Sequence, residues 1–222
     1  MSNPKPYHHG NLHEAILREA ITLAREGGPQ AVTIRAATRA VGVSPTAAYR
    51  HFKDQSSLLD SVADIATAEL IENLSAAFQD TEGSIVDKLM AAAFAYFDYA
   101  HDEQNFFECM MASRGFGIPA GLAAATDGPG EDPRVRAAFN FYDYMGQYAR
   151  AIGQEPDWEF MVQNCLAGWS TVHGFTVLCT SGHLASLSDK HKRDIATSVF
   201  AAAIRGLEFE NPSDPYLNYP KN

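Results

Sequence analysis

The 222-residue sequence has few features of a secreted, membrane-spanning or metal-binding protein. Its three cysteines, Cys109, Cys165 and Cys179, show no CxxC spacing, which argues against both a disulfide framework and a zinc site. No stretch approaches the roughly 20 consecutive apolar residues of a membrane-spanning helix. Residues 1–7 lack the apolar segment of a secretory signal. We therefore expect a cytoplasmic protein, with no membrane partner and with reduced, mostly buried thiols.

Sequence patterns of enzymes are also missing. We find no nucleophile elbow, no glycine-rich phosphate loop and no obvious acid-base pair. These absences predict a protein that is not an enzyme, with no catalytic residues and no cofactor.

Basic residues are scarce, and their scarcity is uneven. The chain has 17 Lys and Arg against 27 Asp and Glu, a net charge of -10. Residues 1–60 hold seven basic and five acidic residues, whereas the remainder holds ten basic and 22 acidic residues. An acidic body is repelled by nucleic acid and would orient a basic N-terminal head towards it. By itself the charge pattern also fits an ordinary acidic protein.

The N-terminal part of the chain predicts three helices. Asn11 and Glu14 have capping-box spacing, so the first helix should start near Leu12 and end at Gly27-Gly28-Pro29. Its predicted inner face consists of Leu12, Ile16, Ala20 and Ala24.

The second and third helices have clear boundaries in the sequence. Thr33 can cap the second helix, and Gly42 can supply the left-handed residue after it. Ser44 and Pro45 then form a cap and first helical residue for a third helix, which runs to about Phe52. Two short helices joined by a turn of about three or four residues are typical of a helix-turn-helix.

Helical periodicity continues through the rest of the chain, without an alternating strand pattern. A long fourth helix follows a cap at Lys53-Asp54, and Ser84 to Asp87 resembles a capping box for the fifth. Later helices are expected over about 103–114, 133–153, 156–181 and 188–210, with a surface loop at 115–133 and an irregular tail at 211–222. The apolar stripe of the fourth helix is Leu58, Val62, Ala66, Leu70, Leu74 and Phe78.

These motifs resemble the TetR family of bacterial repressors. The residues that carry the resemblance are His8-His9-Gly10-Asn11-Leu12, Thr33-Ile34-Arg35, Gly42-Val43-Ser44, and Tyr49-Arg50-His51-Phe52-Lys53 followed by Leu58-Leu59. Trp169, His173 and Gly174 resemble the Trp-His-Gly signature of one group of TetR C-terminal domains. The prediction is an all-α protein of about nine helices, with a helix-turn-helix domain at 1–54 and a helical effector-binding and dimerisation bundle at 55–222.

The resemblance implies that the third helix enters the major groove of operator DNA. Thr46 would hydrogen-bond a base, Pro45 and Ala47 would touch a thymine methyl, and Arg50 would reach a guanine or a phosphate. Pro45 departs from the polar residues often found there, which leaves the operator sequence open. For Arg50 and Lys53 a solvated surface charge is the alternative, and for Tyr49 it is packing. The predicted DNA-binding residues are Thr33, Arg35, Ser44, Pro45, Thr46, Ala47, Tyr49, Arg50, His51 and Lys53.

Clustered histidines near the N-terminus raise the question of a metal site. His8, His9 and His13 have no cysteine or second ligand cluster nearby in sequence, and the adjacent pair matches the family pattern. We therefore predict no metal, and expect a flexible arm that lies near the DNA backbone.

The predicted body is apolar and aromatic, and the resemblance implies a ligand pocket within it. His173 lies four residues after Trp169 on one helix face, so it can serve as a core histidine or as a polar anchor for a ligand or the partner subunit. The predicted ligand-binding residues are Phe94, Phe97, Phe107, Met110, Met111, Phe139, Tyr142, Met145, Trp169 and His173. For each of these residues, packing in the core is the alternative.

Together these predictions describe a homodimeric transcriptional regulator. It would bind a palindromic operator, repress transcription, and leave the DNA when a small apolar effector fills the body. The alternative is a regulator controlled by a protein partner or by thiol oxidation.

Overall fold

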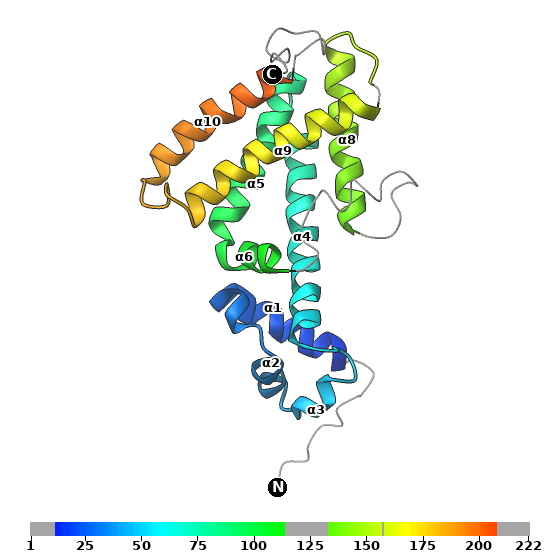
Figure 1. Cartoon of the computed structure of the whole chain (residues 1–222), viewed down its shortest axis with the longest axis vertical. Coiled ribbons are helices and arrows are strands. Elements are labelled where there is room, and N and C mark those ends of the chain that lie inside the picture. Colours follow the sequence, from blue (N-terminus) through cyan, green and yellow to red (C-terminus); the bar gives the residue numbers. More distant parts are fainter. Residues whose placement is uncertain (1–11, 114–132, 157, 208–222) are drawn as a thin grey trace, which may run out of the picture. The chain divides into compact units, whose positions relative to one another are not determined.

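The computed structural model describes residues 12–113, 133–156 and 158–207, and their side chains except those of 133–139, 158–160 and 162. Within these ranges the chain forms nine helices and no strand (Figure 1), which confirms the predicted fold class. None of the described helices is long and apolar enough to cross a membrane. The predicted N-terminal arm, most of the loop at 115–133 and the tail at 211–222 lie outside the described residues.

The helices begin and end close to their predicted boundaries. The exception is the third helix, which has only four residues because the chain turns through His51 to bury Phe52. The bounds are α1 Leu12–Ala31, α2 Ile34–Val41, α3 Pro45–Ala48, α4 Gln55–Asp80, α5 Ile85–Asp102, α6 Gln104–Ala112, α8 Pro133–Ala151, α9 Trp158–Thr180 and α10 Asp189–Gly206.

The chain divides into two compact units. Unit 1 comprises Met1–Ile71 and Tyr99–Ala137, and unit 2 comprises Glu72–Asp98 and Ala138–Asn222. The helices α4 and α5 each contribute residues to both units. The predicted domain boundary after residue 54 comes from sequence motifs and stays a prediction.

Unit 1 is built around the predicted apolar faces of α1 and α4. All four predicted inner residues of α1 are buried, and so are the residues that the α4 stripe contributes to this unit, Leu58, Val62, Ala66 and Leu70. The last two residues of the stripe, Leu74 and Phe78, are buried in unit 2. The predicted break in α1 is present, because Gly28 adopts φ 67° and interrupts the helix before its last turn. The α4 cap also matches its prediction, since the Ser57 amide donates to the Asp54 carboxylate at 2.8 Å.

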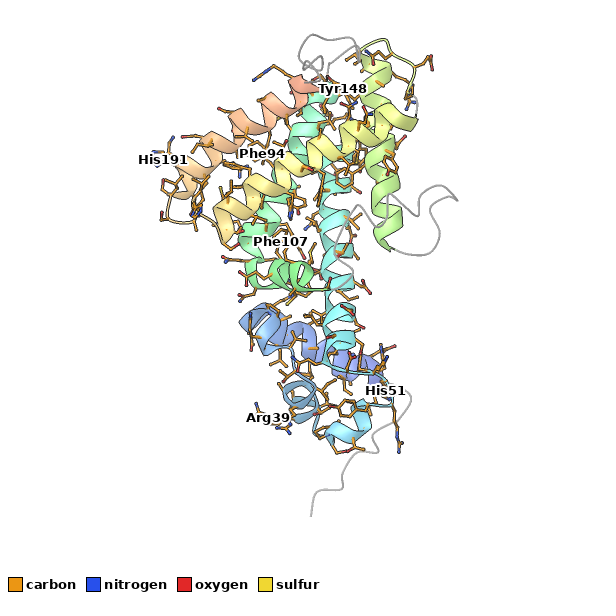
Figure 2. All side chains as sticks on the ribbon, in the orientation of Figure 1. Arg39, His51, Phe94, Phe107, Tyr148 and His191 are labelled. Carbon is orange, nitrogen blue, oxygen red and sulfur yellow. The ribbon has the colours of Figure 1, made fainter. Side chains whose placement is uncertain are left out.

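Unit 2 has an aromatic core between α5, α9 and α10. Phe97, Phe175 and Phe200 form a buried cluster, in which the rings of Phe97 and Phe175 stack 6.1 Å apart. The helices α9 and α10 form a hairpin (Figure 1). Tyr148 of α8 is fully buried and donates to the Ile204 carbonyl of α10 at 3.4 Å, so the hairpin and α8 share one interior (Figure 2).

Candidate functional sites

The turn between α2 and α3 is held in place by local hydrogen bonds. The Thr33 hydroxyl accepts the Ala36 amide at 3.1 Å and thereby caps α2, as predicted. Gly42 follows α2 with φ 81°, and its amide donates to the carbonyls of Thr38 and Arg39. A left-handed residue favours glycine because other side chains clash there. This local geometry sets the direction in which α3 leaves the turn.

The back of α3 is anchored in unit 1, and its other side is exposed. Ala48 and Phe52 are buried, and the ring of Phe52 stacks on His13 of α1 at 4.7 Å. Tyr49, between them in sequence, is 58% exposed, so packing does not account for its side chain. Of the ten predicted DNA-binding residues, Thr33 and Ala47 are half-buried and the other eight are exposed.

The segment from Thr33 to Lys53 has no acidic residue, although the chain as a whole is acidic. Its cations Arg35, Arg50 and Lys53 are all exposed. Arg39 is exposed too (Figure 2), and it was absent from the predicted set because it lies in the middle of α2 rather than at a motif position. Exposed guanidinium and ammonium groups are the groups that bind phosphates.

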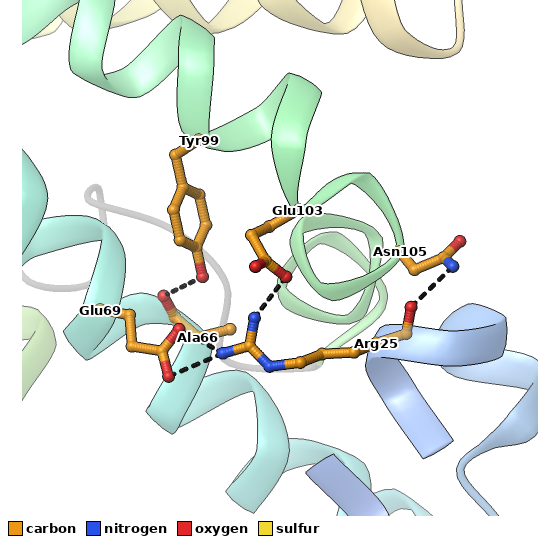
Figure 3. Close-up of polar contacts among 6 residues, drawn as sticks. All are labelled: Arg25, Ala66, Glu69, Tyr99, Glu103 and Asn105. Atoms are coloured by element: carbon orange, nitrogen blue, oxygen red, sulfur yellow. Dashed lines mark hydrogen bonds and ion pairs between the residues drawn. The ribbon is translucent and has the colours of Figure 1, made fainter. Parts of the chain in front are cut away.

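Elsewhere in unit 1, Arg25 joins three helices (Figure 3). Its guanidinium donates to both Glu69 oxygens of α4, at 2.6 and 2.9 Å, and pairs with the Glu103 carboxylate that precedes α6. It also lies over the Phe106 ring, 4.2 Å from the centroid. The Asn105 amide donates to the Arg25 carbonyl at 2.9 Å. The role of Arg25 could not be predicted from the sequence, because its partners Glu69 and Glu103 lie 44 and 78 residues away in the chain.

Unit 2 contains a cavity of about 70 Å³. The side chains around it carry no formal charge, and five of them are aromatic. The lining residues are Leu74, Leu89, Ala92, Ala93, Tyr96, Phe141, Tyr144, Met145, Asn164, Cys165, Gly168, Trp169, Val172, Phe200, Ala203, Ile204 and Leu207.

Hydrogen bonding and stacking organise one wall of the cavity. Tyr96 is buried, and its hydroxyl lies 2.7 Å from Nδ1 of His173. The His173 ring stacks on Trp169 at 4.9 Å. Burial lowers the pKa of His173, so its ring is neutral at pH 7. Burial also raises the pKa of Tyr96, an effect that a hydrogen bond with Trp169 opposes.

Tyr144 belongs to another part of the lining. Its ring stacks on Phe78 at 3.8 Å and meets Phe141 edge-on at 5.9 Å. Its buried hydroxyl has no hydrogen-bond partner among the described residues. Burial raises the pKa of Tyr144, and the Ser75 hydroxyl opposes this rise. The hydroxyl groups of Tyr144 and Ser75 nevertheless do not meet the geometry of a hydrogen bond. A buried hydroxyl without a hydrogen-bond partner costs roughly 1–3 kcal/mol.

The predicted ligand-binding residues are divided between the two units. Met145 and Trp169 line the cavity, and His173 supports it through Tyr96. Phe94, Phe97 and Tyr142 belong to unit 2 without lining it. Phe107 and Met110 are buried in unit 1, where Met111 is exposed. The side chain of Phe139 lies outside the described residues.

Most of the cavity lining was not predicted from the sequence. Tyr96, Tyr144 and Phe200 are aromatic residues on helical faces that resemble ordinary core positions. Small residues such as Ala92 and Gly168 create the space without any chemical signal of their own. The only local clue is the Trp-x-x-x-His segment, whose spacing places Trp169 and His173 on one helix face.

The three cysteines are all free and buried, as the sequence predicted. Burial raises the pKa of Cys109 to about 11 and that of Cys165 to about 12. It also raises the pKa of Cys179, an effect that Lys192 opposes. Because the thiolate is the reactive form, these thiols are poor nucleophiles at neutral pH. No group of three or more His, Cys, Asp or Glu residues suited to a metal occurs in the described part of the chain.

Two protein-family models match the chain. The model described as "Bacterial regulatory proteins, tetR family" matches residues 16–62. The model described as "Tetracyclin repressor-like, C-terminal domain" matches residues 89–207. The more detailed assignment to the Trp-His-Gly group is not confirmed by these matches. No curated protein matches the sequence.

Solved structures share this fold at low sequence identity. A protein of unknown function from Rhodococcus sp. RHA1 is 23% identical, with a TM-score of 0.65 over 91% of this chain and 98% of that one. A TetR variant from Acinetobacter baumannii AYE, solved in complex with minocycline, is 17% identical, with a TM-score of 0.61 over 87% and 94%. A putative tetR family transcription regulator from Shewanella sp. PV-4 is 17% identical, with a TM-score of 0.57 over 86% and 96%.

Proposed function

The chain belongs to the tetR family of bacterial regulatory proteins, and from that premise we propose that it is a homodimeric repressor released from operator DNA by a small effector. The observation that carries the proposal is the exposed, acid-free surface from Thr33 to Lys53 on a folded helix-turn-helix. In a family of DNA-binding regulators, this surface is the part of an acidic chain that phosphates would attract.

The proposed DNA contacts follow from exposure and side-chain chemistry. Thr46 and Pro45, at the start of α3, would face base edges. Arg35, Arg50 and Lys53 would bind phosphates on either side. Tyr49 supports this arrangement, because its exposed ring is available for contact rather than committed to the core.

The DNA contacts can be tested with a double variant, Arg50→Ala with Lys53→Ala, and a duplex of about 40 base pairs from the chain's own promoter region. Loss of two phosphate contacts should weaken binding roughly tenfold or more and flatten its salt dependence by roughly 0.9 per contact. Fluorescence anisotropy over a salt series measures both quantities. The matched control, Lys190→Ala with Arg205→Ala, removes the same charge from exposed positions of α10 and should leave the slope unchanged. An unaltered slope in the first variant would contradict the proposed contacts.

The cavity in unit 2 is the proposed effector site. Its uncharged lining suits an apolar molecule, and a cavity with a few convergent polar groups is the usual form of a small-molecule site. The Acinetobacter protein of the same fold, solved in complex with minocycline, supports a small-molecule role for this architecture. The effector would shift the population towards a form that does not fit the operator.

The proposed dimer would use the hairpin of α9 and α10. Leu178 and Ile195 are large apolar side chains that are about 40% exposed, at 41% and 39%. Gly174 of α9 is exposed, and a side chain built there would meet nothing within 4 Å. An exposed apolar face with a small residue favours close helix packing across a two-fold axis. Light scattering of Leu178→Asp with Ile195→Asp should then report a monomer, whereas the unaltered chain should report a dimer.

The alternative of control by thiol oxidation is not favoured by any particular observation. All three thiols are buried and their pKa values are raised, which is the reverse of what a redox sensor needs. Equal DNA binding with and without a mild oxidant such as diamide is therefore the expected result.

A further inference from the structure

We infer that His13 and His51 form a paired imidazole site for a DNA phosphate, so that the chain binds promoter DNA more tightly as the pH falls. The inference rests on the proposed DNA-binding function. It adds a further contact residue, His13, and a dependence of DNA binding on protons. Two observations carry it: how the two rings are held, and which charges surround them.

The two histidine rings are held beside each other by a buried phenylalanine. His13 is grouped with His8 and His9 in the sequence, but it lies in the first turn of α1, where its ring stacks on Phe52 with 4.7 Å between the centroids. His51 directly precedes Phe52, and its ring meets that of His13 edge-on at 6.1 Å (Figure 2 labels His51). Phe52 is buried, whereas both histidines are exposed. A core residue therefore presents two imidazoles to solvent side by side.

The segment that carries His51 is positively charged. Residues 33–53 include no acidic residue, and Arg50 and Lys53, on either side of His51, are exposed cations. Asp54 follows, but its carboxylate is engaged as the cap of α4. Neither imidazole of the pair forms a hydrogen bond or an ion pair with another described residue. The ring nitrogens are therefore available to a ligand.

The helices that pack against α1 add mainly positive charge near the pair. These helices are α2, α3 and α6. The charged residues of α2 are Arg35 and Arg39, and α3 has none. The charged residue of α6 is Glu108, which lies beside the C-terminal end of α1. Glu14 adjoins His13 in sequence, but adjacent helical residues do not face each other. These surroundings favour an anion as the ligand of the pair.

Protonation of the pair links DNA binding to pH. Histidine is the side chain that ordinarily changes its charge between pH 5 and 8. A protonated ring at His13 is favoured over the face of Phe52, because aromatic faces attract cations. Two imidazolium rings 6.1 Å apart repel each other, and a phosphate beside them offsets this repulsion. The DNA-bound chain then holds more protons than the free chain, so its affinity for DNA rises as the pH falls.

The test measures the affinity of the full-length chain for promoter DNA by fluorescence anisotropy at pH 6 and pH 8, at constant ionic strength. The unaltered chain should bind roughly tenfold more tightly at pH 6, and its salt slope should be steeper there by up to about 0.9 for each histidine that gains a proton. EDTA in every buffer prevents a metal ion from bridging the two rings. Equal affinities at the two pH values would overturn the inference.

Substitutions assign the effect to the pair. His13→Phe keeps an aromatic ring on Phe52 but cannot be protonated, so the ratio of the affinities at pH 6 and pH 8 should fall about threefold, and His51→Gln should lower it by a similar factor. His13→Arg carries its charge at both pH values and should also lower the ratio. His183→Gln, at an exposed position of unit 2, is the control that should keep it. If His13→Phe fails to fold by circular dichroism, His13→Gln replaces it. An unchanged ratio in a folded His13 variant would overturn the role of His13.

The pH series separates this inference from the proposed function. Promoter binding that loses salt dependence in Arg50→Ala with Lys53→Ala, but keeps its pH ratio in the variants of His13 and His51, would contradict the inference and leave the proposed DNA contacts in place. Failure of the chain to bind promoter DNA at either pH would overturn the proposed repressor and the inference together.

Discussion

The two units of the molecule differ in where their chemistry lies. In unit 1 the proposed DNA contacts are exposed cations on a short, locally capped motif, and the interior supports that motif. In unit 2 the proposed site lies inside, around a cavity lined by uncharged side chains. A surface site depends on a few residues close together in sequence, whereas a cavity depends on side chains from five helices. This difference determines which substitutions should affect each unit.

The strongest test of this comparison is whether the interior of unit 1 holds its exposed DNA-binding surface in place. Phe52 is 2% exposed and anchors the chain after α3. Phe52→Ala should lower the free energy of unfolding by about 3–5 kcal/mol, because it leaves a cavity, and should abolish promoter binding. Urea denaturation and fluorescence anisotropy measure the two effects. Tyr49→Ala, three residues earlier and exposed, should change the free energy of unfolding by no more than about 0.5 kcal/mol.

Ion pairs of the two units should differ in their contribution to the free energy of unfolding, because they differ in solvent exposure. Arg25 contacts two carboxylates and an aromatic face while about one third of its side chain is exposed. Arg25→Ala leaves Glu69 and Glu103 without their cation, so the free energy of unfolding should fall by about 2 kcal/mol. Lys190→Ala is the control in unit 2, because its pair with Asp194 is largely exposed, and less than about 0.5 kcal/mol is expected. Equal losses in urea denaturation would show that the Arg25 cluster is an ordinary surface network.

Helix caps allow the same structural device to be compared in the two units. The Thr33 hydroxyl accepts an amide at 3.1 Å at the start of α2, and the Ser188 hydroxyl accepts one at 3.4 Å at the start of α10. Thr33→Ala and Ser188→Ala should each lower the free energy of unfolding by about 1 kcal/mol, with the larger loss at the shorter bond. Only Thr33→Ala should also weaken promoter binding. A loss of DNA affinity in Ser188→Ala would contradict the separation of functions.

The contrast also explains what could be predicted from the sequence. The helix-turn-helix was predictable because its caps and its left-handed Gly42 act on residues three or four positions away. The stripes on α1 and α4 were predictable because helical geometry alone selects them. The shortness of α3 was not, since it depends on Phe52 turning into a core formed by other helices.

The cavity was predictable only as a class of site. Met145 and Trp169 are predicted ligand-binding residues that do line the cavity. Phe107 and Met110 are equally apolar and also lie on predicted helices, but they are core residues of unit 1. Tyr96 and Tyr144 could not be selected, because their importance comes from what faces them. His173 meets one tyrosine hydroxyl, and no described residue bonds the other. Such relations are set by tertiary packing between residues up to 77 positions apart, which periodicity does not encode.

The smallest expected effect concerns the proton balance of unit 2. Burial lowers the pKa of His173 below its ordinary value of 6.5. As the pH falls, the unfolded chain therefore binds a proton at this residue at a higher pH than the folded chain does. The contribution to stability is therefore complete above about pH 7.5 and is lost as the pH falls through 6.5 towards the folded pKa, with a slope of at most about 1.4 kcal/mol per pH unit. Urea denaturation between pH 7.5 and 5.5 should show this decline, and His173→Gln should reduce it. His191→Gln, at an exposed position of α10, should leave the decline unchanged. If the decline is the same in His173→Gln and His191→Gln, then His173 does not cause the loss of stability at low pH.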